Sequence, residues 1–436
     1  MLSILGLLGA LGLLILLTIR GVNLLIAAPF CALIVALSAG IPIFPQAEGQ
    51  ALNFIDQYMG GFTGFVAAWY FMFLLGALFG KMMEDCGAAE SVSNWIVRRF
   101  GSHRAPLAIV AACAVLTYGG VSLFVVAFSV YPLALSLFRQ ADLPRRFIPG
   151  TIAFGSVTFT MTSAGSPEIQ NWIPIKYLGT TPYAGWEVSL VVAAVMAVLG
   201  YWWLLKMLAR ASAKGERFVE REGDPEPHEK ALPHPLAGIV PLAVVLILAF
   251  LLHDRLRQAA LIVALLGGTL TTIAINWRYF LHINSAVGEG VAGSLIAIGN
   301  TSAVVGFGTI AKASPAFAMA VDAMTGIPGN ALIGAAVAVS AIAALTGSAS
   351  GGQAIALPVL APGYLDQGVD PSQLHRVVAI SSGALDSLPQ NGYVVTTIRA
   401  ICGETHRDAY GAMGALTVVV PLIGTALAIL LFAVFG

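Results

Sequence analysis

The octet LDSLPQNG, residues 385–392, separates two apolar runs of the chain. Proline cannot donate a backbone hydrogen bond and interrupts a helix, while asparagine and glycine favour helix ends. Backbone groups freed by such an interruption are tolerated at membrane depth only where the protein or a watery cavity receives them. The octet therefore predicts a helix that is broken inside the membrane.

The composition of the chain indicates a membrane protein. Of its 436 residues, 58% are hydrophobic and 10% are charged, whereas about 25% of the residues of a soluble domain are charged. Apolar stretches close to the length that crosses a bilayer recur along the whole sequence, so we expect an all-α polytopic protein of the cell (inner) membrane. The 22 basic and 22 acidic residues cancel, which gives no indication of a nucleic-acid partner.

The expected helices fall into plain spans and interrupted segments. Plain spans are predicted near 2–19, 21–40, 60–80, 186–208, 236–252, 257–276, 290–311 and 410–435. Amphipathic or polar links are expected at 81–103 and 312–327. Helical hairpins are predicted at 105–138, interrupted by TYGGVS, and at 328–365, interrupted by TGSASGGQ. Broken helices are predicted at 147–177, around TSAGSPEIQN, and at 374–400, around the opening octet.

The same order of irregular segments in both parts of the chain predicts an internal repeat. We expect a first repeat over 1–208, a cytoplasmic linker over 209–235 and a second repeat over 236–436. Each repeat would contain three scaffold helices, a hairpin, a broken helix and a final span. The hairpins either re-enter on one side or cross twice, and the shortness of 105–118 favours re-entrant hairpins.

Basic residues orient the two repeats. Lys and Arg concentrate on the cytoplasmic side of membrane proteins. With the linker inside, each half crosses an odd number of times, so the second repeat is inverted relative to the first. This layout leaves few of the 22 basic residues outside, namely Lys176, Arg255, Arg257, Lys312 and Arg376. Inverted repeats with broken helices are typical of secondary transporters.

The four interruptions predict a site for a small carboxylate. A half-helix that begins inside the membrane presents free N–H groups and a partial positive charge to an anion. Hydroxyl, amide and glycine residues at the breaks would add donors and allow close approach, although small residues also permit plain helix packing. The candidate substrate-binding residues are Thr117, Gly119, Gly120, Ser122, Thr162, Ser163, Ser166, Asn171, Thr346, Ser348, Ser350, Gly351, Ser387, Gln390 and Asn391.

Two acids in the breaks are candidates for cation coupling. An ionised side chain at the bilayer centre costs about 2.5–3.5 kcal/mol on insertion scales, so Asp386 and Glu168 require a partner or a function. Each acid either caps a half-helix while ionised or takes up a proton together with the substrate. His375, beside Arg376, is expected at the membrane interface.

Several stretches resemble the gluconate:proton symporter family of the ion transporter superfamily. The resemblance runs from about residue 60 to 412 and is carried by GKMMEDCGAAESV (80–92) with the basic RRFGSHRAP after it, TSAGSPEIQNWIPIKYLGTTPYAG (162–185), SSGALDSLPQNGYVVTTI (381–398) and GETHRDAYGA (403–412). The last three stretches are most similar to members associated with hydroxybutyrate.

The resemblance implies cation symport, with H⁺ as the coupling ion, of a small hydroxycarboxylate such as 3-hydroxybutyrate. It also implies an elevator-type movement of hairpins and broken helices against a scaffold in a homodimer. Two departures bear on this. Ser166-Pro167-Glu168 stands where gluconate-type members carry a histidine- and proline-rich break, and Gln390 stands where the resemblance leads us to expect histidine. The first departure argues against gluconate, and the second leaves the coupling to Asp386, Glu168 or a sodium ion.

Other functions remain as alternatives. The chain could be a permease for gluconate, another sugar acid or a dicarboxylate, or a Na⁺-coupled carboxylate transporter. A channel is disfavoured because polar residues concentrate at the breaks and form no continuous stripe along the spans. The sequence contains no HExxH, no GxSxG and no cluster of histidine and cysteine, so we expect neither an enzyme nor a metal site nor a cofactor.

Overall fold

The computed structural model describes residues 2–20, 22–44, 53–100, 104–221, 231–257, 259–317, 319, 331–389 and 391–435, and all regular elements within them are helical. Among these residues, seven helices are long and apolar enough to cross a membrane. The predicted all-α class is therefore confirmed.

The first half of the chain contains a helical pair, two long helices and two interrupted segments. The elements are α1 (Leu2–Ile19), α2 (Leu24–Ala39), α3 (Phe54–Asp85), α4 (Ala88–Phe100), α5 (Ala105–Tyr118), α6 (Leu123–Gln140), α7 (Ile148–Ala153), α8 (Ile173–Leu178) and α9 (Trp186–Ala213). A π-helical turn (Phe154–Thr158) continues α7 before the chain breaks.

The second half presents the same kinds of element in the same order. They are α10 (Pro235–Leu256), α11 (Ala259–Asn276), α12 (Ile283–Lys312), α14 (Ala331–Thr346), α15 (Ala349–Asp366), α16 (Pro371–Leu385), α17 (Gly392–Val395), α18 (His406–Gly414) and α19 (Val420–Phe435). The inversion of one half relative to the other stays a prediction, and most of the expected link at 312–327 lies outside the described residues.

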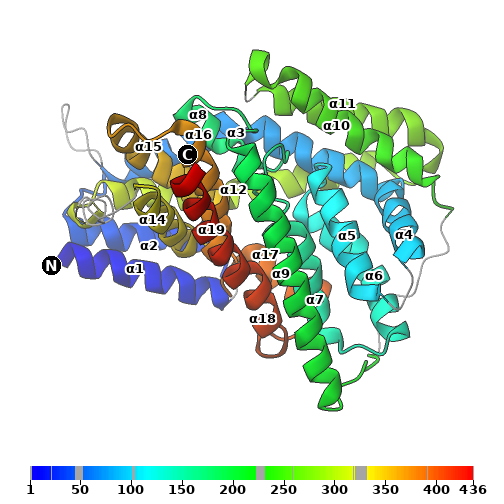
Figure 1. Cartoon of the computed structure of the whole chain (residues 1–436). Helices are drawn as coiled ribbons and strands as arrows, with labels where there is room; N and C mark the ends of the chain where they lie inside the picture. The colour runs from blue at the N-terminus through cyan, green and yellow to red at the C-terminus, as the bar shows by residue number, and fades with distance from the viewer. Residues whose placement is uncertain are drawn as a thin grey trace.

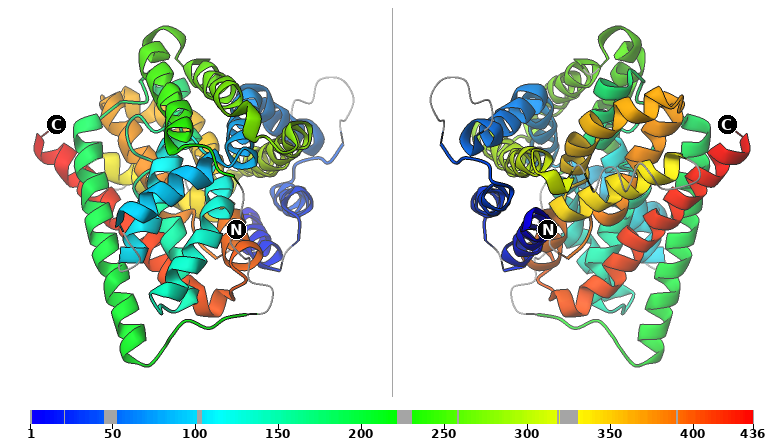
Figure 2. Two further views of the ribbon diagram at one scale, coloured as in Figure 1. Left: turned by 90° about the vertical axis from the view of Figure 1, so that its right-hand side faces the viewer. Right: turned by 90° about the vertical axis from the view of Figure 1, so that its left-hand side faces the viewer.

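The two halves interlock through their long helices. Helices α3 and α12 pack along each other, α2 packs on α12, and α11 packs on α3. Figure 1 shows the pairs α1–α2 and α10–α11 at opposite corners of the molecule. Figure 2 shows α9 beside α19, on the far side of the molecule from α1 and α2. The hairpins and broken helices lie between these helices, and part of the first hairpin reaches the surface.

Helix boundaries follow local capping chemistry and differ in places from the predicted spans. The Asn53 side chain accepts a hydrogen bond from the backbone N–H of Asp56 and starts α3 before the predicted 60–80. Gly40 ends α2 in the left-handed region, at φ 73°, where glycine carries no steric cost. Helix α9 continues to Ala213, past the start of the predicted linker, because its last residues are good helix formers.

A buried ion pair ties the linker end of the molecule together. The Nε of Arg145 lies 3.0 Å from Oε1 of Glu404, and the two side chains are only 6% and 3% exposed. Arg145 also donates to the hydroxyl of Tyr131 and to the backbone carbonyl of Val219. A second arginine, Arg221, lies 3.1 Å from the same carboxylate. One buried acid therefore joins α6, the linker and the connection that follows the second broken helix.

We predict that Glu404→Gln lowers the free energy of unfolding by about 3–5 kcal/mol, because removal of one partner leaves buried positive charge uncompensated. Unfolding of the purified protein in detergent measures this change. Glu404→Gln with the stability of the unsubstituted protein would show that the pair contributes nothing.

The matched control is Glu216→Gln, which removes the more exposed ion pair with Arg146 at 2.7 Å and should change the free energy of unfolding by less than about 1 kcal/mol. The hydrogen bond from Arg146 lowers the pKa of Glu216 from its ordinary value of 4.5. Any stabilisation from this pair is therefore present above that value and is lost as the pH falls through the lowered pKa.

Candidate functional site

The four chain interruptions lie together. We call them the first hairpin tip (119–122), the first helix break (159–172), the second hairpin tip (347–348) and the second helix break (386–391). The hydroxyl of Tyr118, directly before the first tip, donates to the carbonyl of Ala164 in the first break at 2.6 Å. The amide of Asn391 in the second break donates to the carbonyl of Gly347 in the second tip at 2.9 Å.

A glutamine connects the two pairs of interruptions. Nε2 of Gln353, on the second turn of α15, lies 3.0 Å from the backbone carbonyl of Gln170 in the first break and 2.8 Å from the hydroxyl of Ser382 on α16. The first helix break, the second hairpin and α16, the helix that leads into the second break, therefore meet at one fully buried amide. Through these contacts the interruptions lie near one another, and the predicted substrate site between them stays a prediction.

The second tip and the second break expose helix starts to one another. Ser348 caps α15 by accepting from the backbone N–H of Gly351 at 3.1 Å, and its hydroxyl lies 3.2 Å from that of Ser350. Asn391 caps α17 by accepting from the backbone N–H of Val394 at 3.0 Å. The side chain of Thr346 and all of Gln390 lie outside the described part of the structure.

Two hydroxyl groups next to the interruptions, those of Ser387 and Thr117, differ in their hydrogen bonding. Ser387 donates to the carboxylate of Asp386 at 3.0 Å, whereas the buried hydroxyl of Thr117 has no hydrogen-bond partner among the described residues. Ser122 precedes α6 without capping it through its side chain. The binding role predicted for Thr117 stays a prediction.

Close packing explains the glycines of the first hairpin tip. Gly120 adopts φ 92°, and a Cβ atom there would lie 3.2 Å from Val245 and 3.3 Å from Pro167. A Cβ atom at Gly119 would lie 2.7 Å from Leu242. The tip is therefore pressed between the first helix break and the pair α10–α11, and these glycines act in packing in this conformation.

The first helix break is stabilised from within by Asn171 and Trp172. Both side chains donate to the carbonyl of Ser166, at 3.1 and 3.0 Å, and Asn171 also donates to the carbonyl of Pro182 at 2.9 Å. The hydroxyl of Ser163 donates to the carbonyl of Phe159. These hydrogen bonds satisfy backbone groups that the missing helical turns would have paired.

Arg376 is a functional candidate that the sequence reasoning missed. It is fully buried. Its guanidinium donates to the backbone carbonyls of Ala184 at 2.9 Å and Pro182 at 3.1 Å. It also donates to the backbone carbonyl of Thr162 at 2.6 Å and to the side-chain oxygen of Asn171 at 2.9 Å. All four acceptors are neutral. Among the described residues, no carboxylate pairs with this arginine, in contrast to Arg145.

The adjacent histidine is also buried within the protein. Nδ1 of His375 lies 2.6 Å from the hydroxyl of Thr180, and its Nε2 is buried without a partner among the described residues. The expectation that His375 faces the membrane interface is therefore not met by its surroundings. The signal in the sequence was the pair His375-Arg376 in the apolar segment before the opening octet, with Arg376 nine residues before Leu385, since buried charge is rare without a function.

The two acids differ in their contacts. The carboxylate of Asp386 is 7% exposed, accepts the hydroxyl of Ser387, and faces the backbone N–H of Ala349 at the start of α15. Glu168 is half-buried, and its carboxylate makes no hydrogen bond with the described residues. Asp386 therefore occupies the helix start at which a substrate carboxylate is expected.

A histidine contacts the second break, but it is His406 and not a histidine at position 390, where the resemblance led us to expect one. Nε2 of His406, on α18, lies 3.2 Å from the carbonyl of Pro389, while Nδ1 accepts from Arg399 at 3.1 Å. These contacts fit a neutral ring with its proton on Nε2. The ring contributes a donor to the break next to Gln390.

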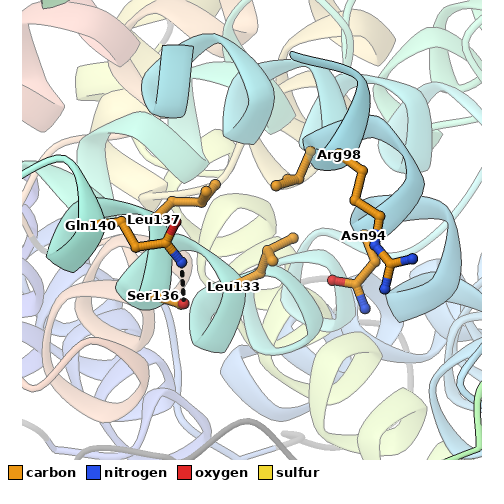
Figure 3. Close-up of a pocket in the computed structure, with 7 residues that line it drawn as sticks. Asn94, Arg98, Leu133, Ser136, Leu137 and Gln140 are labelled. Atoms are coloured by element: carbon orange, nitrogen blue, oxygen red, sulfur yellow. Dashed lines mark hydrogen bonds between the residues drawn. The ribbon is translucent and has the colours of Figure 1, made fainter. Parts of the chain in front are cut away.

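A surface cavity of about 300 Å³ lies apart from the breaks, between α4 and α6. Figure 3 shows Asn94 and Arg98 projecting from α4, and Leu133, Ser136 and Gln140 from α6; Gln140 donates to Ser136. The cavity belongs to the outer surface of the first hairpin and contacts none of the candidate site residues.

Comparison with known proteins establishes the family. The model of a family described as citrate transporter matches residues 13–281. The chain belongs to the citrate transporter family. An uncharacterized transporter of Bacillus subtilis (strain 168), YxjC, is 36% identical over 98% of this chain and 97% of its own length. The protein is therefore a multi-pass membrane transporter and not an enzyme.

More distant similarities agree with this family. A gluconate permease of Pseudomonas aeruginosa is 36% identical over 20% of each chain, and a high-affinity gluconate transporter of Escherichia coli (strain K12) is 30% identical over 31% of this chain and 29% of its own. The crystal structure of the Alcanivorax borkumensis YdaH transporter matches with a TM-score of 0.58 at 14% identity, over 97% of this chain and 98% of that one. The resemblance to gluconate permeases is confirmed, and the closeness to hydroxybutyrate-associated members stays a prediction.

We predict that Arg376→Lys abolishes most transport and lowers the free energy of unfolding by about 3 kcal/mol. The ammonium group keeps the charge, but it cannot satisfy four separated acceptors as the planar guanidinium does, and each buried acceptor left unpaired costs about 1–3 kcal/mol. Uptake in proteoliposomes and unfolding in detergent measure the two effects.

The control for Arg376 is Arg257→Lys. Arg257 contacts the carbonyl of Gly179 at 3.4 Å in the same connection but is exposed, so this variant should behave like the unsubstituted protein. Full activity and stability of Arg376→Lys would show that the guanidinium is dispensable.

Proposed function

We propose that this transporter imports a small hydroxycarboxylate, similar to 3-hydroxybutyrate, by symport with a proton. The observation that carries the proposal is a buried arginine, Arg376, which donates to the first helix break and has no acidic partner among the described residues. A buried positive charge without a counter-ion favours an anionic ligand nearby. The breaks add helix starts, which bind carboxylates without further basic residues.

The names of the similar proteins support a carboxylate as the cargo class. The matching family model is described as citrate transporter, and the partial relatives include gluconate permeases. Citrate carries three carboxylates and gluconate several hydroxyls, whereas the apolar surroundings of these breaks suit a shorter chain. Gluconate, another sugar acid or a dicarboxylate is the alternative cargo, and Na⁺ is the alternative coupling ion.

Asp386 is the proposed proton carrier, with Glu168 as the alternative. While ionised, Asp386 faces the same α15 start that the substrate carboxylate would use. Two carboxylates cannot share one such site in the charged form. Protonation of Asp386 would remove this repulsion and release the backbone N–H of Ala349 to the substrate. Binding of the anion and uptake of the proton would then depend on one another.

The proposed movement is of the elevator type, in which the hairpins and broken helices travel against α1, α2, α3, α10, α11 and α12. This division rests on the order of the elements, since the hairpins and broken helices follow the long helices in each half. A separate apolar core joins α1 and α2 to the region of Tyr58 and the end of α12, while the larger core continues from α3, α10 and α11 into the hairpins and broken helices. A homodimer would anchor the scaffold; this assembly also stays a proposal.

The first test is uptake of labelled 3-hydroxybutyrate into proteoliposomes, driven by either a pH gradient or a sodium gradient, with gluconate and citrate as competitors. We expect accumulation with the pH gradient and weak competition by gluconate. Accumulation only with sodium would move the coupling to the hydroxyl and carbonyl groups of the breaks. Absence of uptake would contradict the proposed substrate.

We predict that Asp386→Asn loses accumulation driven by a pH gradient but retains exchange of internal for external substrate, because the amide resembles the protonated carboxyl group. Asp366→Asn, on the exposed end of α15, is the matched control and should accumulate substrate normally. If Asp386→Asn accumulates substrate and Glu168→Gln does not, Glu168 is the carrier.

The elevator movement predicts state-dependent cross-linking of Gly308→Cys on α12 with Ile355→Cys on α15, in a background without the native cysteines. A Cβ atom at Gly308 would overlap the Ile355 side chain, so the two thiols lie within disulfide range in this conformation. The disulfide should arrest transport.

The control pair lies within the scaffold. A Cβ atom at Gly61 on α3 would lie 2.9 Å from Cβ of Thr309 on α12, so Gly61→Cys with Thr309→Cys should cross-link in every transport condition. Equal cross-linking of both pairs with and without substrate and ion gradients would exclude an elevator movement.

A further inference from the structure

The side-chain oxygen of Gln353 is a buried acceptor without a partner. Gln353 is fully buried, and its Oε1 receives no hydrogen bond from the described residues. Its Nε2 faces two acceptors: the backbone carbonyl of Gln170, and the hydroxyl of Ser382, whose own proton goes to the carbonyl of Ala379. Exchange of the two amide atoms would place oxygen against oxygen, so these contacts fix the orientation of the amide.

A second orphan acceptor belongs to the same junction. Oε1 of Gln170, in the first helix break, is also buried without a hydrogen-bond partner among the described residues. A buried acceptor left unpaired costs about 1–3 kcal/mol. Unpaired acceptors at this junction disfavour a carboxylate and require a donor. A hydroxyl group meets this requirement, because it donates one hydrogen bond and carries no negative charge.

The position of Gln353 on α15 sets its distance from the expected carboxylate position. Ser350 and Gln353 are three residues apart and lie on the same face of the helix, so they are separated by about 4.5 Å along its axis. A carboxylate at the first turn of α15 would place a hydroxyl on its third carbon near Gln353. A hydroxyl on the second carbon lies closer to the carboxylate than this spacing allows.

We propose that Gln353 recognises the hydroxyl group of a 3-hydroxy acid and thereby sets the substrate specificity of the transporter. Oε1 of Gln353 accepts the hydroxyl proton, Gln170 assists it, and the hydrogen bonds of Nε2 hold the amide in this orientation. This inference rests on the proposed carboxylate transport. Because the amide is closed to solvent in this conformation, the ligand reaches it when the breaks open to one side.

The test compares acids that differ only in the hydroxyl group. Purified full-length protein in proteoliposomes takes up labelled 3-hydroxybutyrate, and unlabelled 3-hydroxybutyrate, 2-hydroxybutyrate and butyrate compete with it. The unsubstituted protein should prefer 3-hydroxybutyrate over butyrate by about 10- to 100-fold, since a site built for a hydroxyl rejects the analogue that lacks it. Uptake of labelled butyrate at high concentration is measured in parallel.

In Gln353→Leu, the affinity for 3-hydroxybutyrate should fall to that for butyrate, while the affinity for butyrate stays unchanged. Gln353→Met, with an unbranched side chain of similar length, repeats the test if the leucine variant does not fold. Gln367→Leu, at the exposed end of the same helix, is the matched control and should retain the preference.

Five results would overturn the inference. If Gln353→Leu lowers the affinity for 3-hydroxybutyrate and for butyrate equally, Gln353 acts in packing. If the variant keeps the preference for 3-hydroxybutyrate over butyrate, the oxygen of Gln353 binds only water. A retained preference with altered sodium dependence would assign the oxygen to a cation. Transport by the unsubstituted protein without any hydroxyl preference would refute this inference alone, whereas transport of none of these acids would refute the proposed function as well.

Discussion

Inside a bilayer, a backbone N–H or C=O group without a partner costs several kcal/mol, so a broken helix persists only where other groups replace the missing helical hydrogen bonds. In this transporter the replacements come from side chains next to the breaks and from the opposite half of the chain. Asn171 and Trp172 satisfy the carbonyl of Ser166, and Asn391 satisfies that of Gly347. The helix starts that remain are available to an anion because the breaks are stabilised in this way.

Two arginines extend this arrangement to the connections that follow the broken helices. Arg376, from the second half, contacts the connection after the first broken helix, and Arg145, from the first half, contacts the connection after the second. The two arginines contact corresponding connections, but only one of them pairs with an acidic side chain. Arg145 meets the carboxylate of Glu404, while Arg376 meets only neutral oxygens. The difference leaves Arg376 without a counter-ion among the described residues, whereas Arg145 and Arg221 share the carboxylate of Glu404.

Much of the architecture could be predicted from the sequence because it follows from length, apolarity and helix breakers. The spans near 2–19 and 257–276 and the interruption at TYGGVS agree closely with α1, α11 and the first hairpin tip. The breaks were also found, since Pro167 and Pro389 mark them directly. The contacts between halves could not be predicted. Gln353 and Arg376 act through residues about 200 positions away, and no local pattern records which carbonyl a distant side chain will reach.

The same long-range contacts bear on alternating access. Gln353 on α15 and Arg376 on α16 both donate hydrogen bonds to backbone carbonyls of the first helix break. Displacement of either helix relative to this break would therefore strain or break these hydrogen bonds. If the breaks moved independently, the carbonyls of Thr162 and Gln170 would lose their donors in the membrane interior, at a cost of about 1–3 kcal/mol each. Movement of both breaks as one body keeps these hydrogen bonds intact. The polar contacts between the halves therefore favour movement of both breaks as a single unit, which the proposed elevator movement requires.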